Sequence, residues 1–186
     1  SMTHPAWALA AVQNGGKFRF KNLEPYYDAG SFDNVTQFIG SQLNGSLDWD
    51  YLNEIRAAWD GPLILKGILN GQDATRAVAA GVDGLIVSNH GGRQLDAVPA
   101  SIDLLEAIRS SVGPKVPLLF DSGVRSGLDV ARALAAGADF VMCGRAFMFG
   151  VAALGEAGAD HVLAVLKDEL ENTMVQLGLE RLADLP

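Results

Sequence analysis

Residues 117–127, PLLFDSGVRSG, join a nearly continuous apolar run to a polar, glycine-containing turn and then to the start of a helix. Three other apolar runs follow the same plan, at residues 62–67 (PLILKG), 84–89 (GLIVSN) and 140–144 (FVMCG). Such runs are typical of parallel strands covered on both faces, and their alternation with helical patterns indicates βα units. The sequence therefore predicts an α/β protein with four consecutive parallel strands.

An internal repeat favours a regular, barrel-like array of these units. Residues 73–88 and 129–144 align without gaps at an offset of 56 positions and are identical at seven of them. A (β/α)8 barrel takes about 250 residues, so this chain of 186 residues is expected to hold about half of one. Helices rather than buried strands are predicted for the first part of the chain, at residues 6–12, 35–43 and 48–59, with a polar loop at 13–33.

The composition fits one soluble globular domain and excludes several classes of partner. Hydrophobic residues make up 49% of the chain, and 14 Lys and Arg against 22 Asp and Glu give a net charge of -8. An acidic surface offers little to the phosphates of nucleic acid, so no nucleic-acid partner is expected. The single cysteine excludes a disulfide framework and a multi-cysteine zinc site, and no metal is expected. No apolar run approaches about 18 residues, so we expect no membrane-spanning helix.

Four of the few cations fall at or just after the ends of the four predicted strands: Lys66, Arg93, Arg125 and Arg145. The carboxyl ends of parallel strands share one face, where ligands bind. The alternative is that each cation is a surface residue whose stem packs on the rim. Their common position favours a shared anionic ligand.

The last two strands lead into turns suited to a phosphate group. Gly123 and Arg125 follow one strand, and Gly144 and Arg145 follow the next. Glycine lets backbone N–H groups approach a phosphate, a helix N-terminus adds its dipole, and arginine binds two oxygens at once. One such turn is a weak signal, but two on neighbouring units predict a phosphate site.

Residues 88–96, SNHGGRQLD, carry the most specific pattern. His90 comes directly after a strand, two glycines follow it, and Arg93 can point toward the same space. Neutral imidazole can act as a general base near neutral pH, and guanidinium can bind a carboxylate in a bidentate pair. The simpler interpretation is a loop histidine that bonds the backbone. Lys66 and the phosphate turns on the same face favour the catalytic one.

Together these stretches resemble the FMN-dependent 2-hydroxy acid dehydrogenases and oxidases, a family with flavin-linked L-lactate dehydrogenases, glycolate oxidases and mandelate dehydrogenases. The similarity rests on residues 65–69, 88–96, 121–127 and 144–147 and extends from residue 48 to about 178. Residues 3–7 and 22–23 are most similar to bacterial flavin-linked L-lactate dehydrogenases. The resemblance implies strands five to eight of a (β/α)8 TIM barrel, the carboxyl-terminal half, over residues 48–186. Residues 1–47 would be a variable loop and helix segment that precedes it.

The resemblance also implies FMN as cofactor and a role for each site residue. His90 would be the catalytic base, Lys66 would stabilise the reduced flavin, and Arg93 would bind the substrate carboxylate. The FMN-binding residues would be Lys66, Ser88, Asp121, Gly123, Arg125, Gly144 and Arg145. His90 would take either the hydroxyl proton during hydride transfer or the Cα proton to form a carbanion, and the sequence does not separate these mechanisms.

Because the first half of the barrel has no counterpart here, we expect a fragment that lacks catalysis on its own and pairs with a second copy across its open sheet edges. The parent enzyme would oxidise an L-2-hydroxy acid, with L-lactate the leading candidate, and pass electrons to quinone, a cytochrome or oxygen. We expect it in the cytoplasm, with peripheral contact to the inner membrane as an added hypothesis. That contact would use residues 13–47, whose aromatic and basic side chains are Lys17, Phe18, Arg19, Phe20, Lys21, Tyr26, Tyr27, Phe32, Phe38 and Ile39.

Three interpretations remain open on the sequence alone. One is the FMN-dependent oxidoreductase, marked by the His-Gly-Gly-Arg turn beside Lys66. Another is a phosphate-binding barrel isomerase, which would need the two glycine–arginine turns but not His90 with Arg93. The last is a non-catalytic half barrel that binds phosphate or associates with itself. For residues 13–47, a loop that packs on its own domain is the alternative to a membrane contact.

Overall fold

The computed structural model describes residues 5–13, 22–26, 32–42 and 47–185. The chain divides into two compact units, Ser1–Asp48 and Trp49–Pro186. The first unit contains helix α1 (Pro5–Gln13), the 3-10 helix η1 (Glu24–Tyr26) and helix α2 (Phe32–Gln42). Both α-helices lie where the sequence predicts them.

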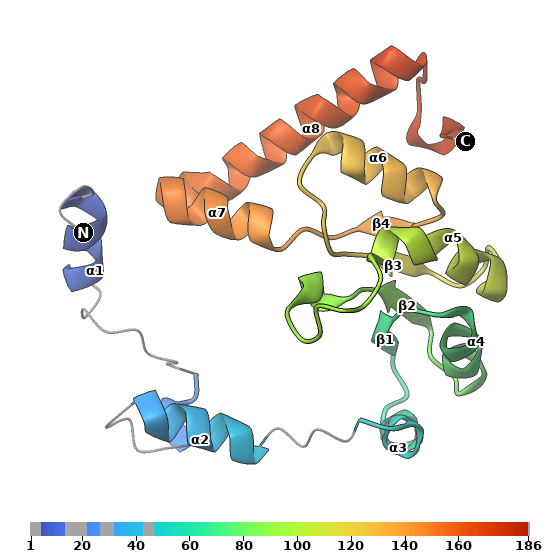
Figure 1. Ribbon diagram of the computed structural model, residues 1–186, viewed down its shortest axis with the longest axis horizontal. Coiled ribbons are helices and arrows are strands. Elements are labelled where there is room, and N and C mark those ends of the chain that lie inside the picture. Colours follow the sequence, from blue (N-terminus) through green and yellow to red (C-terminus); the bar gives the residue numbers. More distant parts are fainter. Residues whose placement is uncertain (1–4, 14–21, 27–31, 43–46, 186) are drawn as a thin grey trace. The chain divides into compact units, whose positions relative to one another are not determined.

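The second unit alternates strands with helices, as predicted (Figure 1). Its elements are α3 (Trp49–Ala58), β1 (Ile64–Ile68), α4 (Gly71–Ala79), β2 (Gly84–Val87), η2 (His90–Gly92), α5 (Ser101–Val112), β3 (Leu118–Phe120), α6 (Gly127–Ala135), β4 (Phe140–Val141), α7 (Arg145–Leu154), η3 (Gly155–Ala157), α8 (Gly158–Leu177) and η4 (Leu182–Asp184). Each of the four predicted apolar runs contains a strand.

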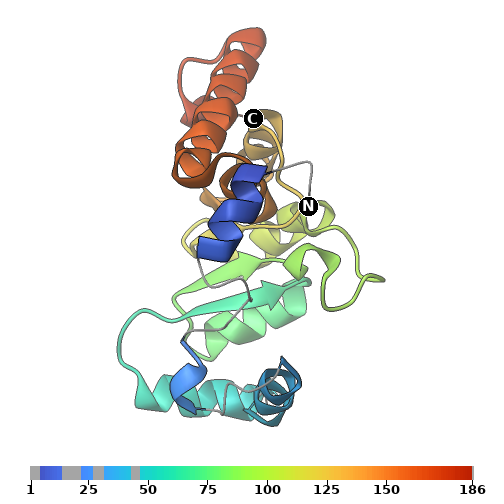
Figure 2. The ribbon, with the colours of Figure 1, turned by 90° about the vertical axis from the view of Figure 1, so that its left-hand side faces the viewer.

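The strands form one parallel sheet in the order β1-β2-β3-β4 (Figures 1 and 2). Sequential order of this kind is that of consecutive barrel units, whereas a doubly wound sheet reverses its strand order near the middle. The carboxyl ends of all four strands therefore open onto the same side.

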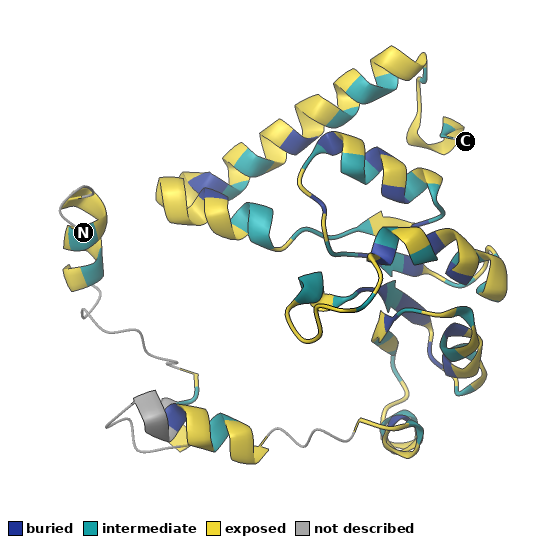
Figure 3. Cartoon of the chain, in the orientation of Figure 1, coloured by how far each residue is buried: buried dark blue, intermediate teal, exposed yellow. Residues whose placement is uncertain are grey.

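Strand β2 is mostly buried (Figure 3), but the two faces of the sheet differ in burial. Leu85, Val87, Leu118 and Phe120 face the helices and are at most 2% exposed. On the opposite face, an in-register row joins Lys66, Ile86, Leu119 and Phe140. The end of that row, Phe140, is 61% exposed. Since parallel sheets are normally covered on both faces, the second face is one wall of an interior that the described residues leave open.

Two helix starts that border the strand ends are capped by side chains. At α4, the Asp73 backbone N–H donates to the Asn70 side chain at 2.7 Å. At α6, Ser126 and Asp129 form a reciprocal capping box, in which each backbone N–H bonds the other side chain at 3.1 Å. The α6 box fixes the turn that follows β3.

An arginine–aspartate arrangement is repeated at the amino ends of the strands. Arg109 donates to the carbonyls of Gly113, Val116 and Gly137 and to the Asp139 carboxylate, which also accepts from the Leu118 N–H. Two βα units earlier, Arg56 donates to the Gly61 and Gly81 carbonyls and to Asp83, which accepts from the Leu63 N–H. The sequence repeat at Asp83 and Asp139 thus has a structural role opposite the strand ends that carry the cations.

Helices α7 and α8 form a closely packed pair. A Cβ on Gly158 would lie 2.2 Å from the Gly150 carbonyl oxygen and 2.5 Å from the Val151 nitrogen. The two backbones therefore touch where both residues lack a side chain. Because α7 begins at Arg145, this contact fixes the position of the last predicted strand-end cation.

One helical stretch of the described chain, Arg145–Leu177, is long and apolar enough to cross a membrane by length and composition. The expectation of no membrane-spanning helix rested on uninterrupted apolar runs, whereas this stretch meets the criterion of length and composition although it contains Glu156 and Asp160. Here the stretch is folded into α7, η3 and α8, and α8 carries charged residues such as Lys167 and Glu171.

Candidate active site

A cavity of about 240 Å³ lies at the carboxyl ends of the strands. It brings together every predicted site residue except Ser88: Lys66, His90, Arg93, Asp121, Gly123, Arg125, Gly144 and Arg145. These residues come from all four strand ends, so the four cations line one cavity, as the sequence predicted. Ser88 is buried directly behind the cavity wall.

Asp121 organises the centre of the site. Its carboxylate accepts from the Lys66 ammonium group, the Ser88 hydroxyl and the Ser122 hydroxyl. Burial alone would raise the pKa of Asp121, but the hydrogen bonds from Lys66, Ser88 and Ser122 and the positive charge of Lys66 outweigh it and hold that pKa below its ordinary value. Asp121 is therefore a carboxylate near neutral pH and keeps Lys66 beside the cavity.

The turns after β3 and β4 fit a phosphate group. A Cβ at Gly144 would meet nothing within 4 Å. Protein packing therefore does not require glycine at this cavity-lining position, whereas close approach of a ligand would. Helix α7 starts at the next residue without a side-chain cap, so its first N–H groups are available to an anion.

The arginines of these turns keep much of their binding capacity. Arg125 donates to the Val124 carbonyl at 2.8 Å, and Arg145 donates from Nη2 to the Gly91 carbonyl at 3.1 Å. A guanidinium group has five donors, so each retains N–H groups that can bind phosphate oxygens.

His90 and Arg93 lie on the short loop that follows β2, and both are exposed. Among the described residues, neither the imidazole nor the guanidinium side chain has a hydrogen bond or ion pair with the protein. Both groups are thus free to bind a ligand in the cavity. The simpler interpretation of His90, a loop histidine with its ring bonded to backbone, does not describe this structure.

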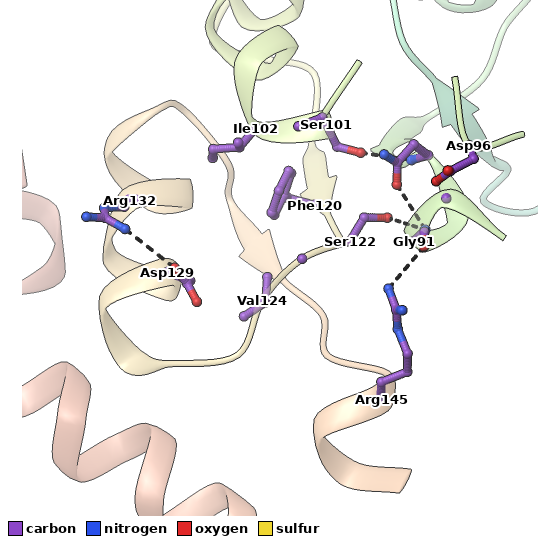
Figure 4. Close-up of a pocket in the computed structure, with 14 residues that line it drawn as sticks. Gly91, Asp96, Ser101, Ile102, Phe120, Ser122, Val124, Asp129, Arg132 and Arg145 are labelled. Atoms are coloured by element: carbon purple, nitrogen blue, oxygen red, sulfur yellow. Dashed lines mark hydrogen bonds and ion pairs between the residues drawn. The ribbon is translucent and has the colours of Figure 1, made fainter. Parts of the chain in front are cut away.

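The loop itself is held by residues that the sequence did not single out (Figure 4). The Asn89 N–H donates to the buried Ser101 hydroxyl at 2.8 Å. The Gly91 N–H is shared between the Asn89 side-chain oxygen at 2.9 Å and Ser122 Oγ at 3.0 Å. Ser101 belongs to α5 and Ser122 to the turn after β3. In the sequence, only their position in or near the predicted motifs could have indicated that they hold this loop.

Other side chains missed by the sequence reasoning line the cavities. Met142, Cys143 and Met148 add an apolar side to the 240 Å³ cavity. Burial raises the pKa of the Cys143 thiol, which makes it a neutral lining group. A neighbouring cavity of about 380 Å³ shares Gly91, Ser122 and Arg145 with the first and continues past Phe120 toward α6 (Figure 4).

The proposed membrane-contact segment is only partly visible. Lys17, Phe18, Arg19, Phe20, Lys21 and Tyr27 lie outside the described residues, as does the side chain of Phe32. Tyr26 is exposed, and Phe38 and Ile39 are half-buried.

Comparison with known proteins gives a consistent result over the whole chain. The sequence model of the FMN-dependent dehydrogenase family matches residues 1–186. The L-lactate dehydrogenase of Pseudomonas entomophila is 43% identical over 188 residues, which cover 100% of this chain and 49% of that protein. The L-lactate dehydrogenase of Chromohalobacter salexigens is 41% identical and is covered to 47%, again with 100% of this chain. The chain thus spans about half the length of the curated relatives it matches.

Solved structures show the same relation. A crystal structure of the monotopic membrane protein (S)-mandelate dehydrogenase aligns with a TM-score of 0.84 and 36% identity, over 98% of this chain and 48% of that one. Mandelate oxidase aligns with a TM-score of 0.69 and 43% identity, over 73% of this chain and 41% of that one. The fold is accordingly that of a partial (β/α)8 barrel, as the sequence predicted.

Proposed function

This chain belongs to the FMN-dependent dehydrogenase family, and on that basis we propose that it supplies two parts of an FMN-dependent oxidation. One is the phosphate cradle, formed by Gly123, Arg125, Gly144 and Arg145, and the other is the catalytic base. The substrate is an L-2-hydroxy acid, with L-lactate the leading candidate, and the product is the 2-keto acid. The observation that carries the proposal is the single cavity in which His90 and Arg93 meet Lys66, Asp121 and the two glycine–arginine turns.

The proposed cofactor-binding roles are those that the family resemblance implies for each group. Gly123, Arg125, Gly144 and Arg145 hold the phosphate, and FMN, when bound, supplies the ring that accepts two electrons from the substrate. The remaining cofactor contacts are Lys66 beside the ring, Asp121 at the ribityl chain, and Ser88, which keeps Asp121 in place through its hydroxyl. Among the described residues, Lys66 is the only ammonium group lining the cavity, and its charge favours an anionic neighbour.

His90 and Arg93 act on the substrate. The Arg93 guanidinium binds the substrate carboxylate in a bidentate pair, which places the hydroxyl-bearing carbon near His90. The neutral imidazole then accepts a proton, from the hydroxyl if hydride leaves Cα or from Cα itself if a carbanion forms. Both routes need the same base, so one variant at His90 tests them together.

The isolated chain is proposed to be inactive. One face of its sheet is open at the row from Lys66 to Phe140, and among the described residues no carboxylate orients His90. Residues 48–186 would complete the site only when further strands cover this face. Self-association of the chain through its open edges, β1 and β4, is part of the same proposal.

The electron acceptor and the location belong to the proposal as well. Quinone, a cytochrome or oxygen would reoxidise the flavin on the cytoplasmic side. Residues 1–47 are proposed as a separate loop and helix segment, with peripheral membrane contact through residues 13–47. In support, one structural relative is described as a monotopic membrane protein.

Binding of two flavins tests the cofactor assignment. FMN and riboflavin differ by the phosphate, so we expect this chain to bind FMN at least about tenfold more tightly, as charge-assisted contacts to phosphate predict. Arg145→Ala should remove most of that preference, whereas Arg181→Ala, an exposed arginine that lines neither the 240 Å³ cavity nor its neighbour, should keep it. Equal affinity of the unaltered chain for both flavins would contradict the cradle.

Turnover is tested separately, by anaerobic bleaching of bound flavin. The chain alone should not respond to L-lactate. After assembly with the amino-terminal half of the Pseudomonas entomophila relative, L-lactate should bleach the flavin and D-lactate should not. Bleaching by the chain alone would refute the proposed inactivity, and an assembled, flavin-loaded complex that no 2-hydroxy acid reduces would refute the oxidation.

A further inference from the structure

The described chain contains two non-glycine residues with a positive φ, His90 at 56° and Ser122 at 85°. Such conformations are uncommon and costly for residues with a Cβ, and they persist where surrounding contacts hold them. His90 and Ser122 lie on different loops, after β2 and after β3. Both loops meet at Gly91.

The Gly91 peptide is held from two sides by the phosphate turns. Its N–H donates to Ser122 Oγ at 3.0 Å, and its carbonyl accepts from Arg145 Nη2 at 3.1 Å (Figure 4). Ser122 directly precedes the cradle residue Gly123, and Arg145 is itself a cradle residue. Gly91 directly follows His90, so the same peptide joins the cradle to the proposed base.

Ser122 is well placed to transmit a change in the cradle. Its hydroxyl donates to Asp121 at 2.7 Å while it accepts from Gly91, so it has a defined orientation. The second acceptor of the Gly91 N–H, Asn89, lies within the same loop and shapes the turn locally. Ser122 is therefore the acceptor that connects the His90 loop to the carboxyl end of β3.

Arg145 can hold Gly91 and an anion at the same time. Nη2 makes its contact with the Gly91 carbonyl, and the structure gives no other hydrogen bond to this guanidinium among the described residues. Its remaining donors can bind phosphate oxygens, and a bound phosphate would restrict the guanidinium and with it the Gly91 carbonyl.

We propose that occupation of the phosphate cradle orders the His90 loop through Gly91, and that Ser122 is a positioning residue in this coupling. The proposal rests on the proposed function for the role of His90, but the contacts it uses are present in this chain alone. A phosphate group in the cradle would stabilise the loop conformation that holds His90 at the cavity.

Hydrogen exchange followed by mass spectrometry tests this on the complete chain, with inorganic phosphate as the probe. Exchange in segments 121–127 and 144–148 reports binding at the cradle, and exchange in segment 88–95 reports the loop. At saturating phosphate we expect exchange in 88–95 to slow about fivefold, the factor that one hydrogen bond is worth in an opening equilibrium.

Two substitutions separate the coupling from simple binding. Ser122→Ala removes the hydroxyl, and Ser122→Gly removes both the hydroxyl and the cost of the positive φ, so at least the second should fold. Each should reduce the phosphate effect on 88–95 to about twofold or less while the cradle segments still respond. Ser111→Ala, which removes an exposed helix hydroxyl bonded only to the Ala107 carbonyl, should behave like the unaltered chain.

A response in the cradle segments without slowing in 88–95, or slowing that both Ser122 variants retain in full, would overturn the coupling and leave the proposed function intact. The absence of any phosphate response in the cradle segments would overturn the coupling and the phosphate cradle together.

Discussion

Replacement of Gly158 by alanine should destabilise the second unit through a collision of backbones. The added Cβ would lie 2.2 Å from the Gly150 oxygen, 2.3 Å from the Gly150 carbonyl carbon and 2.5 Å from the Val151 nitrogen. Relief requires α7 and α8 to separate by about 1 Å or more, and overpacking of this kind costs about 1–3 kcal/mol, at times more. Position 158 is the first residue of α8, so alanine recovers little helix propensity there.

We therefore expect the free energy of unfolding to fall by about 2–3 kcal/mol, which lowers the Tm by about 5–10 °C for a chain of this size. Urea and thermal unfolding followed by circular dichroism would measure it. Gly40→Ala is the matched control, because it adds the same carbon within α2, where a Cβ meets nothing within 4 Å, and should be neutral or slightly stabilising. A Gly158→Ala variant as stable as the Gly40→Ala variant would refute the close-contact reasoning.

Four further expectations concern charge and chemistry. In the assembled enzyme, His90→Ala should lower kcat by about 10²–10⁴, and Arg93→Lys, which keeps the charge but loses the fork, should mainly raise KM for the hydroxy acid in steady-state assays. Arg109→Met should lower the free energy of unfolding by about 2–4 kcal/mol in urea titrations, because it removes one carboxylate and three carbonyl partners at once. The lowered pKa of Asp121 contributes stability that is present above the ordinary value of 3.8 and is lost as pH falls through the folded value. Acid titration should accordingly show a shallower loss of stability below about pH 4 for Asp121→Asn; an unchanged slope would contradict the network.

Most of the fold could be predicted because each element carries a local signal. The four apolar runs, the caps at Asn70 and Ser126 and the helical periodicity all depend on neighbours a few residues away. Strand ends were less predictable: residues 140–144 contain a strand of only two residues, because only Phe140 and Val141 pair with β3. The close contact between α7 and α8 was not predicted, because it depends on Gly150 and Gly158 meeting without side chains.

The candidate site was predictable in its members but not in its connections. Lys66, His90 and Arg145 could be found because strand ends of a parallel sheet share a face. The bond from Arg145 to the Gly91 carbonyl, and that from Gly91 to Ser122, join residues 54 and 31 positions apart in the chain. Pairings at such separations depend on loop conformations, including the positive φ of His90 and Ser122, that no local pattern specifies.

The paired arginines at the amino ends of the strands affect how such a protein can evolve. Arg56 and Arg109 anchor their units at the end opposite the cavity, and each does so with an aspartate at equivalent positions of the repeat. Under the proposed function, a change at Arg93 or Gly91 that suits a different acid would leave these anchors untouched. Substrate preference would then change at little cost to folding.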